Sequence, residues 1–243
     1  MHVPIFLLAE SDLIYVWSKA TYEGRAVIVI LGIFSIFAWS VMASKALQMR
    51  RAKKLNHYFD AEFRSQKHVL EVYDRRLQVT DCPLFAVYQE GCKELDTRLR
   101  PAGSSARREN VSIKVMEHIK RTLERTVAQQ AIRLESGLIL LAIAVSGAPF
   151  LGLLGTVWGV MSTFSGIAAA AARGGKADLA AMAPGVSAAL ITTVAGLLVA
   201  IPSMFGYNWL VHNLRVLTVE LDNFAQELTS KIETEYLRDE DME

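Results

Sequence analysis

Three long apolar stretches constrain the fold of this 243-residue chain more than any other feature of its sequence. Residues 27–47 carry a single charge, Lys45, and residues 137–172 and 179–211 carry none. About 20 helical residues cross the hydrocarbon core of a bilayer, so apolar runs of this length predict membrane spans. The sequence therefore predicts an all-α membrane protein with three transmembrane helices, and it excludes a soluble globular domain.

The stretches between the spans complete the expected layout. We expect a periplasmic N-terminal segment (1–24), a first span (25–47), a cytoplasmic helical region (48–135), a second span (136–171), a periplasmic loop (172–183), a third span (184–211) and an acidic cytoplasmic helical tail (212–243). Residues 1–24 lack the basic start and the cleavage site of a signal peptide. We therefore expect them to remain on the protein as an amphipathic segment at the membrane surface.

Basic residues are concentrated after the first span. Residues 45–135 hold 19 Lys and Arg against 12 Asp and Glu, and four of these basic residues lie within 48–54. Positive residues beside a span favour the cytoplasmic side, so the N-terminus is expected outside and the C-terminus inside. The net charge of the whole chain is only +1, which gives no reason to expect nucleic acid as a partner.

Two polar segments have the periodicity of amphipathic helices. From Val111 to Leu134 apolar residues recur every three or four positions, and we expect this helix to continue without a break into the second span. The acidic tail holds 3 basic and 9 acidic residues and repeats the pattern from Leu214 to Ile232. The tail has two interpretations: it packs against the basic cytoplasmic region, or it is a solvated helix.

Catalytic and metal-binding motifs are missing from the sequence. It has no phosphate-binding glycine loop with its lysine, no HExxH and no paired CxxC. His57 and His68 stand alone in polar surroundings, and Cys82 and Cys92, ten residues apart without a neighbouring histidine, make a poor metal site. We expect no metal and no cofactor, and an enzyme has little support.

The second and third spans each carry a narrow stripe of small residues with a threonine at mid-depth. In the second span the stripe is Gly152, Thr156, Gly159 and Thr163; in the third it is Ala189, Thr193, Gly196, Ala200 and Ser203. Small residues let membrane helices approach closely, and packing alone explains many such stripes. Hydroxyls without a nearby charge also suit a path for ions or water, or a hydrogen bond to a polar group of a partner.

Prolines and the lack of carboxylates add two further expectations. Pro184 fits the first turn of a helix, whereas Pro149 and Pro202 are interior and should kink their helices. Between residues 137 and 211 the charged residues are Arg173, Lys176 and Asp178, all in the expected outer loop. A proton-driven device needs a titratable group within the membrane, so a partner would have to supply the carboxylate.

Two long motifs resemble the TolQ/ExbB/MotA proton-channel family, and TolQ-like subunits most closely. The first is Ala148-Pro-Phe-Leu-Gly-Leu-Leu-Gly-Thr-Val-Trp-Gly-Val-Met161. The second is Ala183-Pro-Gly-Val-Ser-Ala-Ala-Leu-Ile-Thr-Thr-Val-Ala-Gly-Leu-Leu-Val-Ala-Ile-Pro202, followed by Tyr207-Asn208. The resemblance implies an inner-membrane ring, a pentamer, whose second and third helices line a central pore. It also implies a TolR-like or ExbD-like single-span partner that carries an essential membrane Asp.

The resemblance also assigns roles to particular residues. Thr156 and Thr193 match the family threonines that face the partner's Asp. The stripe residues Gly152, Gly159, Thr163 and Gly196 are further candidates for the ion path. Ala188 stands where TolQ-like and ExbB-like chains often have Glu, so no role of that Glu is carried over. That the ion is a proton rather than sodium rests on the resemblance.

Three functions follow from these observations. The first is a TolQ-like stator subunit of a proton-driven motor acting on a Tol-Pal client. The second is an ExbB-like subunit that energises TonB-type uptake. The third is a pore-free membrane scaffold, in which the threonine and glycine stripes only pack helices together.

Overall fold

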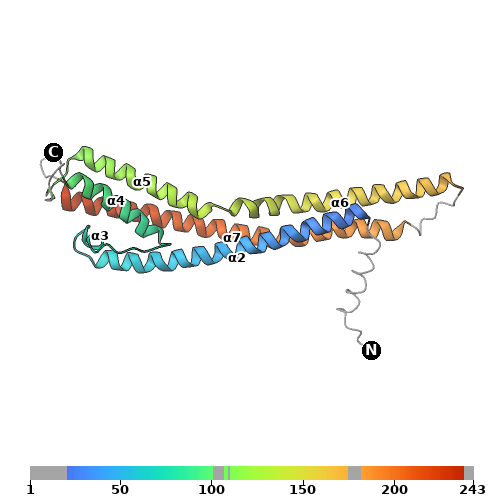
Figure 1. Ribbon diagram of the computed structural model, residues 1–243, viewed down its shortest axis with the longest axis horizontal. Helices are drawn as coiled ribbons and strands as arrows, with labels where there is room; N and C mark the ends of the chain where they lie inside the picture. Colours follow the sequence, from blue (N-terminus) through green and yellow to red (C-terminus); the bar gives the residue numbers. More distant parts are fainter. Residues whose placement is uncertain (1–20, 101–106, 109, 175–181, 238–243) are drawn as a thin grey trace, which may run out of the picture. The chain divides into compact units, whose positions relative to one another are not determined.

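The computed structural model describes residues 21–100, 107–108, 110–174 and 182–237, and this part of the chain is almost entirely helical (Figure 1). Its helices are α2 (Tyr22–Ser65), α3 (Glu71–Asp74), α4 (Pro83–Leu99), α5 (Ile113–Glu135), α6 (Leu138–Ala172) and α7 (Ala183–Tyr236). A parallel bridge between Val111 and Leu237 is the one β pairing among the described residues. The expected amphipathic segment 1–24 and the loop 172–183 lie largely outside this part of the chain.

Three of these helices are long and apolar enough to cross a membrane: α2, α6 and α7. The protein is therefore all-helical with three candidate spans, as the sequence predicts. Helix α2 continues beyond Leu47 to Ser65, and α7 continues beyond Val211 to Tyr236. The change from apolar to polar composition at those positions is therefore not a helix end, and both spans extend into polar helical segments.

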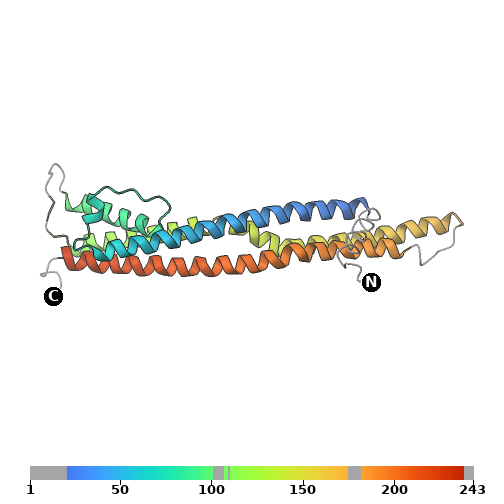
Figure 2. The same cartoon turned by 90° about the horizontal axis from the view of Figure 1, so that it is seen from below.

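The chain divides into two compact units. One, here the apolar unit, comprises residues up to Ala43 and Gly137–Asn208; the other, the polar unit, comprises Ser44–Ser136 and the chain from Trp209. In the apolar unit α6 and the N-terminal half of α7 run side by side (Figures 1 and 2). Val27 and Leu31 of α2 are buried there with Ala148 and Ala200. Large side chains such as Phe150 and Phe205 are exposed, as expected for helices surrounded by lipid.

Aromatic residues form the centre of the polar unit. The rings of Phe63 and Phe224 lie 5.1 Å apart in an edge-to-face arrangement, and Phe59 contacts both Tyr88 and Phe224. Aromatic pairs of this geometry contribute about 0.5–1.5 kcal/mol beyond the area that they bury. Because Phe224 belongs to α7, the C-terminal helix is part of this core.

Polar contacts fix the tail helix in the same place. Lys231 lies 4.5 Å from the centre of the Phe63 ring and donates to the carbonyl of Gln66, just past the end of α2. Glu235 accepts from the backbone N–H of Val69. The tail therefore packs against the polar region, and the alternative of a solvated helix is wrong.

The expected continuous helix from the polar region into the second span is also wrong. Helix α5 ends at Glu135 and α6 begins at Leu138. Gly137 between them has φ 85° and ψ −14°, a left-handed conformation that glycine adopts without steric cost and that no helix contains. Hydrogen bonds from Ser136 Oγ to the Arg133 carbonyl and from Lys45 Nζ to the Leu134 carbonyl satisfy the end of α5.

The periodicity of α5 correctly predicted its buried face. Ile119, Leu123, Val127 and Leu134 are buried, as expected from their spacing, and Met116 and Thr126 join them. Val111, which the pattern included in the helix, precedes it and pairs with Leu237 instead. The helix also touches α4 closely, because the side chain of Leu123 lies against Gly91.

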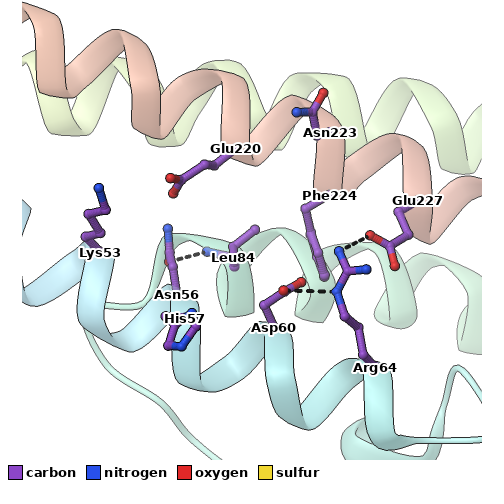
Figure 3. Close-up of a pocket in the computed structure, with 10 residues that line it drawn as sticks. All are labelled: Lys53, Asn56, His57, Asp60, Arg64, Leu84, Glu220, Asn223, Phe224 and Glu227. Carbon is purple, nitrogen blue, oxygen red and sulfur yellow. Dashed lines mark hydrogen bonds and ion pairs between the residues drawn. The ribbon is translucent and has the colours of Figure 1, made fainter.

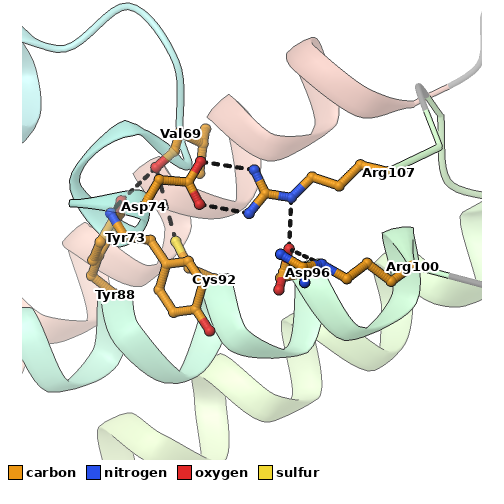
Figure 4. Close-up of polar contacts among 8 residues, drawn as sticks. All are labelled: Val69, Tyr73, Asp74, Tyr88, Cys92, Asp96, Arg100 and Arg107. Carbon is orange, nitrogen blue, oxygen red and sulfur yellow. Dashed lines mark hydrogen bonds and ion pairs between the residues drawn. The ribbon is translucent and has the colours of Figure 1, made fainter. Parts of the chain in front are cut away.

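Charged residues bind the short helix α3 to α4 (Figure 4). Arg107 donates to both carboxylate oxygens of Asp74, at 2.6 and 2.8 Å, and its Nε donates to Asp96 at 2.6 Å. The Arg107 hydrogen bonds hold the pKa of Asp74 below its usual value. Beside them the Tyr88 hydroxyl donates to the Val69 carbonyl at 2.6 Å and accepts from the Tyr73 N–H at 2.9 Å.

Candidate functional site

Glycines let α6 and α7 approach each other closely. A Cβ on Gly152 would lie 2.8 Å from the Thr192 carbonyl oxygen, and one on Gly159 would lie 2.7 Å from the Ala189 Cβ. A Cβ on Gly196 would lie 2.6 Å from the Ala148 carbonyl oxygen. Real Cβ atoms do not come so close to other atoms, so the packing of these helices requires glycine at all three positions.

Through these contacts the small-residue stripes of α6 and α7 face each other within one chain. Gly152, Gly159 and Gly196 are buried between α6 and α7. The sequence allowed two explanations of the stripes, close helix packing and an ion path. For these three glycines the structure shows close packing. Thr163 lies against Gly185 and donates to the Gly159 carbonyl. That any of these residues lines an ion path in an assembly stays a prediction.

The structure brings Thr156 and Thr193 together. Their Oγ1 atoms lie 2.5 Å apart, one on α6 and the other on α7. Both side chains are partly exposed, at the edge of the glycine contact rather than inside it. The two threonines that the sequence singled out in separate spans therefore form one hydroxyl pair that a group outside the chain can reach.

One carbonyl oxygen serves both members of this pair. Thr156 Oγ1 lies 3.0 Å and Thr193 Oγ1 lies 3.2 Å from the Gly152 oxygen. Each hydroxyl has one proton to donate, so one hydroxyl can donate to this carbonyl while the other donates to its neighbour. If the two hydroxyls exchange these hydrogen bonds, the hydroxyl oxygen that accepts no hydrogen bond within the pair changes as well. That oxygen is the one that can accept from a group outside the pair. The pair can therefore accept from, or donate to, an incoming carboxyl group by rotating its hydroxyls.

Thr192 also belongs to this contact, although the stripe expected in the third span does not include it. It is fully buried and lies within hydrogen-bond distance of both the Gly152 and the Ala189 carbonyl oxygens. Its methyl and hydroxyl groups fill the space beside Gly155, another glycine that the stripe left out. The spacing of Gly152, Gly155 and Gly159, at i, i+3 and i+7, was the available signal, because those positions share one helix face.

The prolines lie within or at the start of their helices. Pro184 is the second residue of α7, in its first turn, and Pro149 and Pro202 are interior to α6 and α7. Each interior proline removes one backbone N–H, which leaves the carbonyl four residues earlier without its helical partner. Both helices continue through these positions, and kinks there stay predictions.

Ala188 is buried where three helices meet. It lies beside Thr21 and Gly24 at the start of α2 and beside Gly155 and Gly159 of α6. These residues line a small hollow together with Ala188, and all of them are small. The Thr21 hydroxyl accepts from the N–H of Gly24.

Both cysteines are buried, and His68 lies on the surface. Cys82 and Cys92 are buried free thiols, and burial raises the pKa of Cys92 to about 12. His68 is exposed and lies 3.1 Å from Glu235. Among the described residues no group of three or more His, Cys, Asp or Glu is placed to hold a metal ion.

A polar pocket of about 380 Å³ lies between α2 and α7 in the polar unit (Figure 3). Asn56 and Lys53 point from α2 towards α7, and Glu220 points back from α7. The Asn56 Oδ1 accepts from the Leu84 N–H at the start of α4, which fixes the orientation of the amide. Arg64 pairs with Asp60 and Glu227, so ion pairs join α2 to α7 at one end of this pocket.

Comparison with known proteins decides the family of the chain. The profile of the MotA/TolQ/ExbB proton channel family matches residues 88–223, which include the second and third spans and the threonine pair. The chain belongs to the MotA/TolQ/ExbB proton channel family. Together with the three apolar helices, this membership places it in the inner membrane as a subunit of a channel-type family rather than of a known enzyme family.

Relatives of two kinds resemble the chain over most of its length. The Tol-Pal system protein TolQ of Haemophilus influenzae is 32% identical over 231 residues, which cover 92% of this chain and 95% of that protein. The TolQ protein of Pseudomonas aeruginosa is 30% identical over 86% of this chain and 87% of its own length. The biopolymer transport protein ExbB of Neisseria meningitidis is 30% identical over 83% and 88%. Members of this family work with single-span partners in a complex.

Proposed function

We propose that the chain is a stator and channel subunit of a proton-driven motor of the Tol-Pal type. Several copies, in a pentameric ring, surround a TolR-like single-span partner that supplies a membrane Asp. Ion flow through that Asp is coupled to work on a client in the periplasm and at the outer membrane. The pairing of Thr156 with Thr193, in spans without a carboxylate, is the observation that carries this proposal.

The threonine pair suits a carboxyl group that changes its protonation state. An Asp in an apolar pore has its pKa raised by desolvation, so the partner's Asp alternates between charged and neutral forms. A charged carboxylate needs a donor, whereas a neutral carboxylic acid needs an acceptor. The hydroxyl oxygen whose lone pairs stay free can accept from the neutral acid, and a hydroxyl that turns away from its neighbour or from the Gly152 carbonyl can donate to the carboxylate.

Orientation follows from the charges. The polar segment after the first span is rich in Lys and Arg, so we propose that the polar unit and the C-terminus are cytoplasmic and that the N-terminus is periplasmic. The two TolQ relatives match between 86% and 92% of the chain. The ExbB relative matches 83% of the chain, so an ExbB-like subunit that energises TonB-type uptake is the alternative.

Proton flux in liposomes holding this protein with its single-span partner tests the proposal. Thr156→Val and Thr193→Val keep the shape of the side chains but remove the hydroxyls, and we expect each to reduce flux at least about ten-fold. Thr156→Ser keeps the hydroxyl and should retain most of the flux. Ser146→Ala is the matched control, because the Ser146 hydroxyl donates to the Ala142 carbonyl on the same helix, away from the pair.

The pore-free scaffold predicts a different result. A pore-free scaffold conducts neither as wild type nor as variant, although it still assembles with the partner. If the valine variants assemble and conduct as well as a conducting wild type, the threonines serve only packing and their proposed place in the ion path is wrong. Repeating the measurement with a sodium gradient identifies the ion. Expression in cells lacking TolQ and in cells lacking ExbB then separates the two family roles, by restored outer-membrane integrity in one case and restored TonB-dependent uptake in the other.

A further inference from the structure

The polar unit has a second hollow, which is lined by residues that come shortly after the first span and shortly before the second in the sequence. Its volume is about 270 Å³, and its lining comes from α2, from the end of α5 and from the segment that enters α4. The polar residues that line it are Gln48, Thr80, Asp81, Gln130 and Arg133. This volume is slightly below the ~300 Å³ at which pockets for drug-sized molecules begin, and it suits a smaller polar group.

The position of the hollow along the chain puts it at the depth of lipid headgroups. Gln48 directly follows the apolar stretch of α2, and Leu134 comes four residues before the start of α6. At 1.5 Å of rise per helical residue, both positions lie within a few ångströms of the end of a span. The polar headgroup region of a bilayer occupies this depth.

The groups around the hollow favour an anion. Arg133 forms no ion pair or side-chain hydrogen bond with its guanidinium within the described residues, and the amides of Gln48 and Gln130 and the hydroxyl of Thr80 add uncharged donors. Lys45 lies beside them and donates to Gln48 Oε1. The one acidic member, Asp81, is balanced by Arg51 at 3.6 Å. An arginine with neutral donors around it is the composition that binds phosphate groups.

Val79, which lines the hollow, is an exposed apolar residue, and two more exposed apolar residues directly precede lining residues in the sequence. Leu47 is 66% exposed, Ile132 is 67% exposed and Val79 is 36% exposed. Leu47 directly precedes Gln48, and Ile132 directly precedes Arg133. A ligand with a phosphate and apolar chains would satisfy both kinds of surface, whereas free phosphate would leave the apolar residues in water.

We propose that this hollow binds the phosphodiester headgroup of an anionic phospholipid, here named the headgroup pocket. Arg133 pairs with the phosphate, Gln48, Gln130 and Thr80 donate to its oxygens or to the attached glycerol, and the acyl chains lie along Leu47 and Ile132. The inference does not depend on the proposed motor function, since it concerns residues outside the α6–α7 contact.

Photo-crosslinking in liposomes tests the headgroup pocket. The full chain is reconstituted with photoactivatable phosphatidylglycerol in a phosphatidylcholine bilayer, and labelling is mapped to the peptides that contain residues 45–54 and 126–136. One Lys or Arg near the membrane surface contributes about 1 kcal/mol of attraction to anionic lipid, so Arg133→Gln should raise the half-saturating mole fraction of the probe about five-fold. Photoactivatable phosphatidylcholine should label these peptides no more than it labels others.

Arg125→Gln is the matched control. It removes the same charge from an exposed position on the same helix, two turns away and outside the hollow. It should leave the half-saturating fraction unchanged. Equal effects of the two substitutions, or equal labelling by phosphatidylcholine, would overturn the proposal, since binding would then follow overall charge or nothing at all.

A soluble phosphate ester could occupy the headgroup pocket in place of a lipid, because it carries the same phosphate group. Excess glycerol phosphate should not displace the lipid probe, because it lacks the acyl chains. If it displaces the probe as effectively as unlabelled phosphatidylglycerol does, the pocket binds free phosphates and the lipid assignment is wrong. Circular dichroism of each variant verifies that loss of labelling is not loss of helix.

Discussion

The side chain of Thr192 occupies the space that a Cβ on Gly155 would need, with its Oγ1 2.6 Å from that position. The Thr192 hydroxyl lies within hydrogen-bond distance of the Gly152 and Ala189 carbonyls, so rotating it away would leave its one proton without either acceptor. The contact of α6 with α7 therefore depends on the absence of a side chain at one residue and on a buried hydroxyl at another.

Gly155→Ala should destabilise the protein. Overpacking of this kind costs about 1–3 kcal/mol, and we expect a lower midpoint of thermal unfolding in detergent. Gly147→Ala is the control on the same helix, because nothing lies within 4 Å of a Cβ at Gly147. It should leave the midpoint unchanged or raise it. Equal midpoints for the two variants would show that the contact tolerates a methyl group.

Tyr88→Phe should destabilise the polar unit. The change leaves the Val69 carbonyl with only the weak thiol donor of Cys92, at 3.9 Å, and the Tyr73 N–H without its acceptor. Unsatisfied buried groups cost about 1–3 kcal/mol, which denaturant titration of helical content would detect. Tyr58→Phe, at a ring that is 62% exposed, should have little effect. A Tyr88→Phe midpoint as high as that of the control would contradict the hydrogen-bonded role of this hydroxyl.

Arg107→Gln should weaken the link between α3 and α4 in a pH-dependent way. The pKa of Asp74 is lowered in the folded protein, chiefly by hydrogen bonds from Arg107, so its contribution to stability is present above the ordinary aspartate pKa. That contribution is lost as the pH falls through the lowered value. Because Asp74 is half exposed, solvent screening limits the effect to about 1 kcal/mol.

Unfolding curves of wild type and Arg107→Gln over the acid range test this prediction. The two should differ near neutral pH and converge in acid, where the Asp74 carboxylate is protonated in both. A difference that stays constant with pH would mean that Arg107 acts through packing instead. Arg108→Gln, at the neighbouring exposed arginine, controls for the loss of charge.

The native cysteines should resist alkylation. Burial raises the pKa of both thiols, that of Cys92 to about 12, and only the thiolate reacts quickly. A cysteine introduced by Ser230→Cys, at an exposed position of α7, should react with maleimide about 100-fold faster or more. Once the chain is unfolded, all three should react alike. Rapid labelling of Cys82 or Cys92 in the folded protein would contradict their burial.

Periodicity was enough to predict the buried faces of the long helices. The apolar positions of the tail, from Leu217 to Ile232, are buried, as their spacing predicts, because a helix must cover an apolar stripe wherever it finds a partner. Periodicity does not predict which helices this apolar face of the tail packs against. The aromatic cluster of Phe59, Phe63 and Tyr88 decides it, and those residues come from helices distant in the sequence.

The prediction of a continuous helix into the second span was wrong because a single residue, Gly137, changes the backbone direction. Gly137 is one glycine among several in an apolar stretch, and composition does not reveal which of them adopts a positive φ. Likewise, Thr192 and Thr193 are adjacent and chemically alike, but a rotation of about 100° separates them on the helix. That rotation buries Thr192 and leaves Thr193 partly exposed to meet Thr156.

Helices α2 and α7 each pass from the apolar unit into the polar unit without interruption, over 44 and 54 residues. At 1.5 Å per residue these are rods of about 66 and 81 Å. Every turn of these helices is joined to the next by backbone hydrogen bonds, so neither α2 nor α7 has a break between its apolar and its polar residues. The third passage of the chain, from α5 to α6, runs through Gly137, whose positive φ interrupts the helical hydrogen bonds. Two of the three passages between the units are therefore continuous helices and the third is not.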